Sequence, residues 1–289
     1  MYEKILVPLD GSDLAQAAVP AATEIARVLG SRIILLNVCS MSEDKYELYQ
    51  DYLDMLAKKV TDDTGKKAMS VVARGSATEE IIKYIEENKI SLTIMATHGR
   101  SGISYWVIGS VAERVIRETN RPVLLLRSQE KCAVSHEGIL RRILVPLDGS
   151  RMGEAALRYI EALAKKAGSA IVLLHILERQ YHFAVVAGTY VQVPYTDEEM
   201  EPVRREARAY LDRVARRLTK KGINVSTEMR EGKVAEGIIE YAGKSGINLI
   251  AMSTHGRSGV SRWVLGSVAD KIIHSGCARV MVVRPPDVT

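Results

Sequence analysis

Short apolar runs alternate with longer amphipathic stretches along the chain. The runs Lys4–Leu9 and Arg32–Val38 carry apolar side chains at nearly consecutive positions, which is typical of strands covered on both faces. The stretch between them, Asp13–Leu29, has helical spacing. Strands and helices that alternate in this way predict a parallel sheet with helices on both faces.

Capping residues mark the ends of the first predicted helix. Ser12 is a suitable N-cap, and Gly30 is suited to end the helix. Pro20 lies inside the pattern and predicts a kink, because proline has no amide hydrogen to donate. The elements expected after the second strand are a helix over Asp44–Asp63, a strand over Lys67–Arg74, a helix over Thr78–Asn88, a strand over Leu92–Thr97, a helix over Gly109–Glu118 and a strand over Pro122–Arg127.

The whole pattern occurs twice. ILVPLDGS at Ile5–Ser12 recurs unchanged at Ile143–Ser150, and THGRSG at Thr97–Gly102 recurs at Thr254–Gly259. The period is too long for a solenoid unit, so it indicates a duplicated domain. The strands expected in the second copy are Arg142–Leu147, Ala170–Ile176, Asn224–Arg230, Asn248–Ser253 and Ala278–Arg284.

The duplication predicts the domain organisation. We expect one domain over residues 1–129, a linker over 130–139 and a second domain over 140–286, each with a five-stranded parallel, doubly wound sheet. The last strands of the two copies are apolar edges that need cover. We therefore predict that they meet and hold the two copies together as an internal pseudo-dimer, since fusion raises the effective concentration of one copy near the other. Two chains pairing as a homodimer is a further expectation.

One segment, Glu178–Thr196, is longer in the second copy than in the first. Three interpretations stay open for it: a flap over a ligand, a dimer contact, or a passive surface hairpin.

Composition narrows the class of protein. Hydrophobic residues make up 47% of the 289 residues, and no apolar run reaches the ~18 residues of a membrane span, so we expect no membrane partner. Because the sequence has no recognisable leader, we expect the protein to be located in the cytoplasm. Three scattered cysteines without a CxxC pair predict no zinc site. The net charge is +5, but much of the basic excess lies between Arg204 and Lys221. The spacing of these residues indicates the solvent-exposed face of a helix. With one Phe and two Trp, nucleic acid is not an expected partner.

The candidate chemistry lies in two repeated loops. In open α/β sheets, ligands bind beyond the carboxyl ends of the strands, where the strand order reverses. A helix that begins near Gly109 offers unsatisfied amides and a dipole that favour an anion. Gly99 and Gly109 let the main chain approach phosphate oxygens closely, while Ser110 and Arg100 add donors.

The strand followed by Pro-x-Asp-Gly-Ser, together with a late Thr-His-Gly-x9-Gly-Ser, resembles the universal stress protein (UspA-like) family over nearly the whole of both copies. The family's ATP-binding signature is G-x2-G-x9-G-[S/T]. Its last two glycines and its serine are matched in both copies, whereas the first glycine is Ala96 in one copy and Ser253 in the other. Both replacements are small, so the loop can still close on a nucleotide.

The resemblance implies two tandem Rossmann-like domains of the adenine nucleotide α-hydrolase type, each binding ATP or AMP, with any Mg²⁺ arriving on the nucleotide. The implied residues of the first domain are Pro8, Asp10, Val38, Ala96, His98, Gly99, Arg100, Gly109, Ser110 and Val111. Those of the second domain are Pro146, Asp148, Ile176, Ser253, His255, Gly256, Arg257, Gly266, Ser267 and Val268.

Two of these residue types have a second interpretation. Asp10 is either a ribose ligand, since a carboxylate accepts two hydroxyl hydrogen bonds, or a turn former and helix cap. His98 and His255 are expected to shape the loop instead of acting as acid or base.

Other reaction classes lack their motifs. GxxxxGK[ST], GxGxxG after a first strand, GxSxG and HExxH are all absent from the sequence. We therefore predict no catalytic residues and no dedicated metal site. Three functions follow in order of preference: a nucleotide-binding sensor or regulator in the stress response, an interaction scaffold with degenerate sites, and a slow ATPase.

Overall fold

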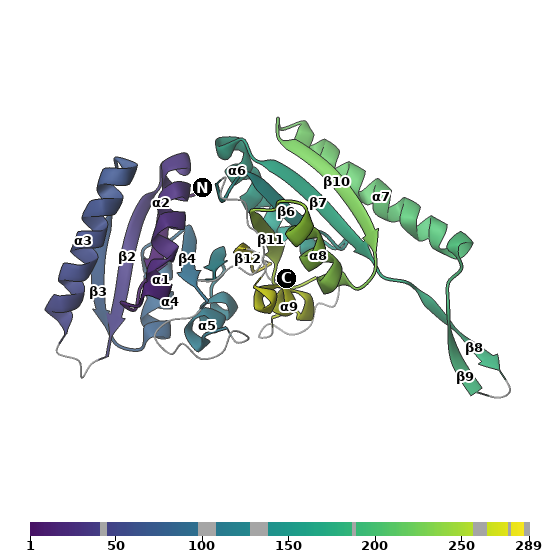
Figure 1. The fold of residues 1–289 in the computed structure, drawn as a ribbon, viewed down its shortest axis with the longest axis horizontal. Coiled ribbons are helices and arrows are strands. Elements are labelled where there is room, and N and C mark those ends of the chain that lie inside the picture. Colours follow the sequence, from purple (N-terminus) through teal and green to yellow (C-terminus); the bar gives the residue numbers. More distant parts are fainter. Residues whose placement is uncertain are drawn as a thin grey trace.

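The computed structural model of the chain describes residues 1–40, 45–97, 108–127, 138–186, 189–256, 265–276 and 279–285. Figure 1 shows two α/β lobes side by side, with helices on both faces of a shared sheet. No helix in this described part combines the length and the apolar character needed to cross a lipid bilayer.

The first domain has the five parallel strands that the sequence predicts, in the order β3-β2-β1-β4-β5. Its elements are β1 (Lys4–Pro8), α1 (Asp13–Gln16), α2 (Ala18–Leu29), β2 (Arg32–Cys39), α3 (Tyr46–Thr64), β3 (Met69–Arg74), α4 (Ala77–Glu87), β4 (Leu92–Ala96), α5 (Ser110–Glu118) and β5 (Val123–Leu126).

The second domain repeats this order and adds a hairpin. Its elements are β6 (Arg142–Pro146), the 3-10 helix η1 (Gly153–Ala156), α6 (Leu157–Ala167), β7 (Ala170–Leu177), β8 (Tyr181–Val186), β9 (Thr189–Pro194), α7 (Asp197–Thr219), β10 (Asn224–Glu231), α8 (Val234–Lys244), β11 (Leu249–Ser253), α9 (Ser267–Ser275) and β12 (Arg279–Val283). The predicted fold class is confirmed.

The first predicted helix is broken in two at Ala17, between α1 and α2. Pro20 follows three residues later, and its nitrogen cannot donate to the carbonyl of Gln16. The second copy has no proline here, yet it also starts irregularly, with η1. The turn before the helix therefore contributes to the break. Ser12 is the N-cap, as expected, and its Oγ accepts from the amide of Ala15 at 3.2 Å.

The two domains are joined through their last strands. β5 and β12 pair antiparallel, with Leu124 opposite Met281 in the centre, so the strands form one ten-stranded sheet. This is the contact that the apolar edges predict, and the internal pseudo-dimer is confirmed. Apolar strands of this kind gain stability because pairing removes their edges from water.

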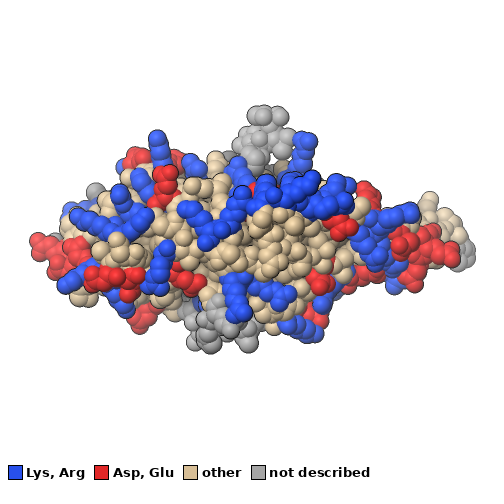
Figure 2. Space-filling model, turned by 90° about the horizontal axis from the view of Figure 1, so that it is seen from above, with Lys and Arg blue, Asp and Glu red and all other residues tan. Residues whose placement is uncertain are grey.

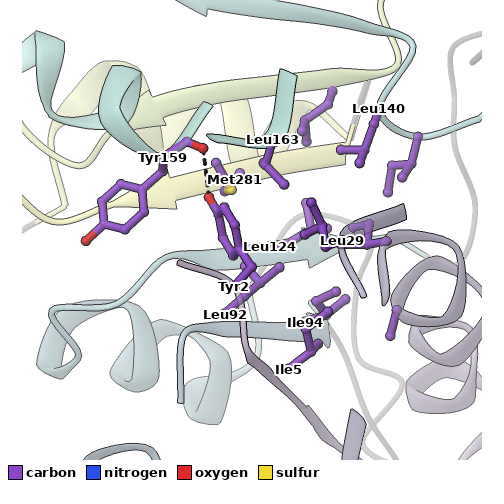
Figure 3. Close-up of a cluster of buried hydrophobic side chains, with 14 of the residues drawn as sticks. Tyr2, Ile5, Leu29, Leu92, Ile94, Leu124, Leu140, Tyr159, Leu163 and Met281 are labelled. Carbon is purple, nitrogen blue, oxygen red and sulfur yellow. Dashed lines mark hydrogen bonds between the residues drawn. The ribbon is translucent and has the colours of Figure 1, made fainter. Parts of the chain in front are cut away.

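Two hydrophobic cores run across the junction. Side chains of both domains, including Leu92, Leu124 and Met281, belong to one buried cluster (Figure 3). In the same place, the hydroxyl of Tyr2 donates to the main-chain oxygen of Tyr159 at 3.0 Å. Each of these buried side chains contributes roughly 1.5–3 kcal/mol, so the junction is part of the folding core.

Two arginines cross the junction in a reciprocal way. Arg127 follows β5 and donates from Nη1 to the carbonyl of His274, in the last turn of α9, at 3.0 Å. Arg284 follows β12 and donates from Nη1 to the carbonyl of Arg117, in the last turn of α5, also at 3.0 Å. Each domain thus caps the end of the other domain's last helix, where a positive charge is favourable.

The insert in the second copy is a hairpin. β8 and β9 pair antiparallel as a separate two-stranded sheet, and the hairpin extends away from the body of the second domain (Figure 1).

Candidate functional site

The sheet topology places the site where each central strand ends. β1 lies between β2 and β4, and β6 lies between β7 and β11, so the strand order reverses at the carboxyl ends of β1 and β6. Asp10 and Asp148 follow these two strands. The carboxyl ends of β4 and β11, next to them in the sheet, lead into the glycine-containing loops. The two repeated motifs therefore lie at adjacent strand ends.

The aspartates organise a tight turn. Oδ1 of Asp148 accepts from the amide of Ser150 at 2.9 Å and from its hydroxyl at 2.7 Å. Oδ1 of Asp10 makes the same two bonds with Ser12, at 2.9 and 2.6 Å. The turn-forming interpretation of Asp10 is thus present in the geometry, while the helix cap is the serine. Ribose binding by the same carboxylates stays a prediction.

In the second copy, the aspartate meets the loop glycine directly. A Cβ atom added at Gly256 would collide with Oδ2 of Asp148, and one added at Gly153 would collide with Oδ1. The carboxylate is therefore held between two main-chain segments that approach it closely because both residues are glycines.

A hydrogen bond ties the two ends of each glycine-containing loop. Gly266 donates its amide to the carbonyl of Thr254 at 2.9 Å, and Gly109 donates to Thr97 at 2.8 Å. A Cβ added at Gly266 would lie 2.8 Å from the Thr254 oxygen. The φ of Gly266 is −60°, which any residue can adopt, so glycine is required here by space alone.

The N-caps of the helices that follow these glycines make no side-chain hydrogen bond to the first turn. Gly109 and Gly266 are the N-caps of α5 and α9, and glycine has no side chain that could accept from the first turn. Ser110 and Ser267 are exposed at the first helical position. The first-turn amides and the helix dipole together favour an anion at this place.

The other predicted residues surround these two features. Pro8 and Ser253 are buried, Pro146, Ala96, Val38, Val111 and Val268 are partly buried, and Ile176 is buried at the end of β7. Ser253, which replaces the first signature glycine, donates its hydroxyl to the carbonyl of His255 at 2.5 Å. The replacement thus stabilises the start of the loop through a side chain.

His255 is held within the loop. Its Nδ1 lies 3.0 Å from the hydroxyl of Thr254, and its Nε2 is buried. The predicted residues His98, Gly99, Arg100 and Arg257 lie outside the described residues, as does most of each glycine-containing loop.

Sequence reasoning missed a tyrosine beside each aspartate. Tyr210 donates to Glu154 at 3.1 Å, and burial, followed by the charge of Glu154, raises the pKa of its phenol; Asp148 adds to the effect. In the first copy, Tyr52 donates to Gln16 at 3.4 Å. Burial raises the Tyr52 pKa, as do Asp10 and Asp13. Aligning the two copies beyond their loop motifs would have shown these matched tyrosines.

In the described part of the chain, no group of three or more His, Cys, Asp or Glu side chains is arranged to hold a metal ion.

Comparisons with known proteins agree with this arrangement. The sequence model described as "Universal stress protein family" matches residues 1–127 and again residues 140–284. Universal stress protein MJ0531 of Methanocaldococcus jannaschii is 30% identical over 145 residues, covering 45% of this chain and 85% of that protein. A universal stress protein of Mycolicibacterium smegmatis is 24% identical over 298 residues, covering 97% of both chains.

Solved structures share the two-domain fold. The crystal structure of a universal stress protein from Archaeoglobus fulgidus aligns with a TM-score of 0.72, covering 98% of this chain and 99% of that one, at 21% identity. At this identity the likeness shows the fold alone.

Proposed function

The chain belongs to the universal stress protein family, and we propose that it is a regulator that binds one ATP or AMP in each copy. The observation that carries the proposal is the convergence of Asp148, Gly256 and the start of α9 at the carboxyl edge of the sheet. The Asp148 carboxylate, which is suited to ribose hydroxyls, lies against the start of the loop. The first-turn amides of α9, which are suited to phosphate, follow the end of the same loop.

The expected binding energy is sufficient for a cellular nucleotide. Each charge-assisted hydrogen bond from a first-turn amide or from Ser267 contributes about 1.5–3 kcal/mol. Three or four such bonds, with burial of the base against Ile176, reach the roughly −8 kcal/mol of micromolar affinity. Mg²⁺ would arrive with ATP, because its preferred ligands are phosphate oxygens and water.

The two sites can be counted by calorimetric titration with ATP and with AMP. We expect two equivalents per chain for the wild type, one for Gly109→Glu, one for Gly266→Glu, and none for the double variant. The glutamate fills the space beside the Thr97 or Thr254 carbonyl and repels phosphate. Ser226→Glu, at an exposed position of the edge strand β10, is the matched control and should keep both sites.

The proposal fails if the wild type binds neither nucleotide at millimolar concentration and mass spectrometry finds none released from the denatured protein. Circular dichroism of each variant distinguishes loss of a site from loss of the fold.

A scaffold with degenerate sites is the second candidate, and the side chains at Ala96 and Ser253 favour it. It predicts that Gly109→Glu leaves function in the cell unchanged, whereas nucleotide-dependent regulation predicts its loss. Slow ATP hydrolysis is the weakest candidate. It requires phosphate release above background that Asp10→Ala or Ser110→Ala abolishes.

A further inference from the structure

The hairpin of β8 and β9, which we call the arm, is an uncharged ribbon on a charged protein. Residues 181–194 contain no Lys, Arg, Asp or Glu, although the chain as a whole is 26% charged. Among the residues that the structure describes, the strands of the arm pair only with each other, as a sheet separate from the ten-stranded one. A two-stranded ribbon is at best marginally stable in water, so the arm needs further cover.

One face of the arm is largely apolar and exposed, with one polar residue, Gln192. Tyr181, Phe183 and Val185 alternate along β8, and the strand register places Tyr190, Gln192 and Pro194 of β9 on the same face, with Gln192 opposite Phe183. The exposed fractions are 52% for Tyr181, 70% for Phe183, 62% for Val185 and 78% for Tyr190. Phe183 is the only phenylalanine of the chain. Residues of the opposite face, such as Ala184, Val191 and Val193, are partly buried.

The exposed area is large enough for an interface. An aromatic side chain presents about 150–250 Å², so the three rings expose roughly 400 Å². Val185 and Pro194 bring the face to about 500 Å², which is at the upper range of patches on monomeric proteins. Two such faces packed together would bury about 1,000 Å², the lower bound for a specific interface.

We propose that the arm is a self-association surface, on which the arm of a second copy packs face to face about a twofold axis. The contact would be isologous, with Phe183 and Tyr190 of one chain meeting the same residues of the other. Aromatic pairs of this kind also add stability beyond their buried area.

The internal pseudo-dimer cannot supply the partner. Each chain has one arm, because the first copy connects β2 to α3 through the short segment 40–45. The matching edges β5 and β12 are already paired with each other. Of the two outer edges of the sheet, β10 carries Glu228, Arg230 and Glu231, whose charges discourage pairing, and β3 lies at the opposite end of the sheet, in the first domain. The nearest source of an identical apolar ribbon is therefore another chain.

The charges beside the arm disfavour an anionic partner. The first turn of α7, which follows the arm directly, contains Asp197, Glu198 and Glu199, and these acidic residues outnumber Arg179 before the arm and Arg204, which pairs with Asp197. Figure 2 shows acidic side chains, with basic ones beside them, at the end of the molecule from which the arm extends. A nucleic acid or an anionic lipid surface would be repelled at this place, whereas an uncharged arm would not.

Sedimentation velocity of the full chain over about 1–200 µM tests the proposal. We expect a concentration-dependent dimer, and at least a tenfold weaker dimer for Phe183→Asp and for Tyr190→Asp, since either variant buries a charge at the contact. Thr189→Asp places the same charge on the opposite face and should dimerise like the wild type. Thermal unfolding at a concentration where the wild type is monomeric should be unchanged in all three variants, because the arm lies outside both hydrophobic cores.

Three results would overturn the proposal. A wild type that stays monomeric at 200 µM has no such interface. A dimer that survives Phe183→Asp uses another surface. Wild-type protein that is monomeric and binds neutral phosphatidylcholine vesicles, while Phe183→Asp does not bind them, would assign the arm to a lipid surface. None of these measurements depends on nucleotide binding.

Discussion

The carboxylate of Asp148 lies directly against the Cα atom of Gly256, so that a methyl group at position 256 would collide with Oδ2. This contact joins the turn after β6 to the loop after β11. The two repeated motifs of the sequence therefore belong to one structural unit in the second copy. The turn after β6 and the loop after β11 can lie this close together because residue 256 is a glycine.

Gly256→Ala should destabilise the protein through this one contact. We expect a loss of about 1–3 kcal/mol in the free energy of unfolding, because the added methyl group overpacks the turn. In the Asp148→Ala background the colliding oxygen is gone, so the same change should cost much less. Urea denaturation of the four proteins gives the coupling energy, which we expect at about 0.5–3 kcal/mol. An equal cost in both backgrounds would mean that the loop tolerates the methyl group by moving away.

The reciprocal arginines should each stabilise the junction between the domains. Arg127→Ala and Arg284→Ala remove a charge-assisted hydrogen bond to a helix end in the other domain. We expect each to lower the free energy of unfolding by about 1–3 kcal/mol. Arg208→Ala, at an exposed position of α7, is the control and should change it by less than about 0.5 kcal/mol.

The two arginine variants should also behave alike, since the contacts are related by the pseudo-twofold axis. Chemical denaturation followed by circular dichroism measures both. If only one of the two variants lowers the free energy of unfolding, the two arginine contacts do not contribute equally to stability.

The architecture could be predicted from the sequence because the patterns that indicate it are local or repeated. Consecutive apolar residues predicted the strands, and the exposed apolar edges at Pro122–Arg127 and Ala278–Arg284 predicted the junction. The contact of Asp148 with Gly256 could not be predicted, since it depends on the distance between two strand ends that the fold alone brings together. The place of Tyr210 beside Asp148 depends in the same way on how α7 packs.

For the arm, prediction from the sequence has a different limit. The length of this segment in the second copy left a passive surface hairpin as one of three possibilities, and the structure has a hairpin, whose role stays a prediction. What covers Phe183 is not encoded in any local pattern, because an exposed apolar face and a buried one have the same alternation.

Tyr2 should make stability at the junction depend on alkaline pH. Its hydroxyl donates to the Tyr159 carbonyl across the domain boundary, and burial raises the pKa of the Tyr2 phenol well above its usual 10.0, with Tyr159 adding to the effect. Below pH 10 the phenol is neutral in both the folded and the unfolded chain. Its contribution to stability is therefore complete and independent of pH.

Above pH 10, the unfolded chain releases this proton while the folded chain keeps it, so stability falls as the pH rises. The slope from one such group reaches about 1.4 kcal/mol per pH unit. Tyr2→Phe loses the hydrogen bond and should cost about 1 kcal/mol at pH 7. The variant also lacks the titrating group, so its stability should fall less steeply above pH 10.

Urea denaturation at pH 7, 9, 10 and 11 should therefore show the gap between wild type and Tyr2→Phe narrowing as the pH rises above 10. Tyr46→Phe, at an exposed tyrosine, is the control for removal of a phenol outside the core and should follow the wild type at each pH. A gap that stays constant from pH 7 to 11 would show that the hydroxyl of Tyr2 is as accessible to ionisation in the folded protein as in the unfolded chain. The hydrogen bond to Tyr159 would then not be a closed contact between the domains.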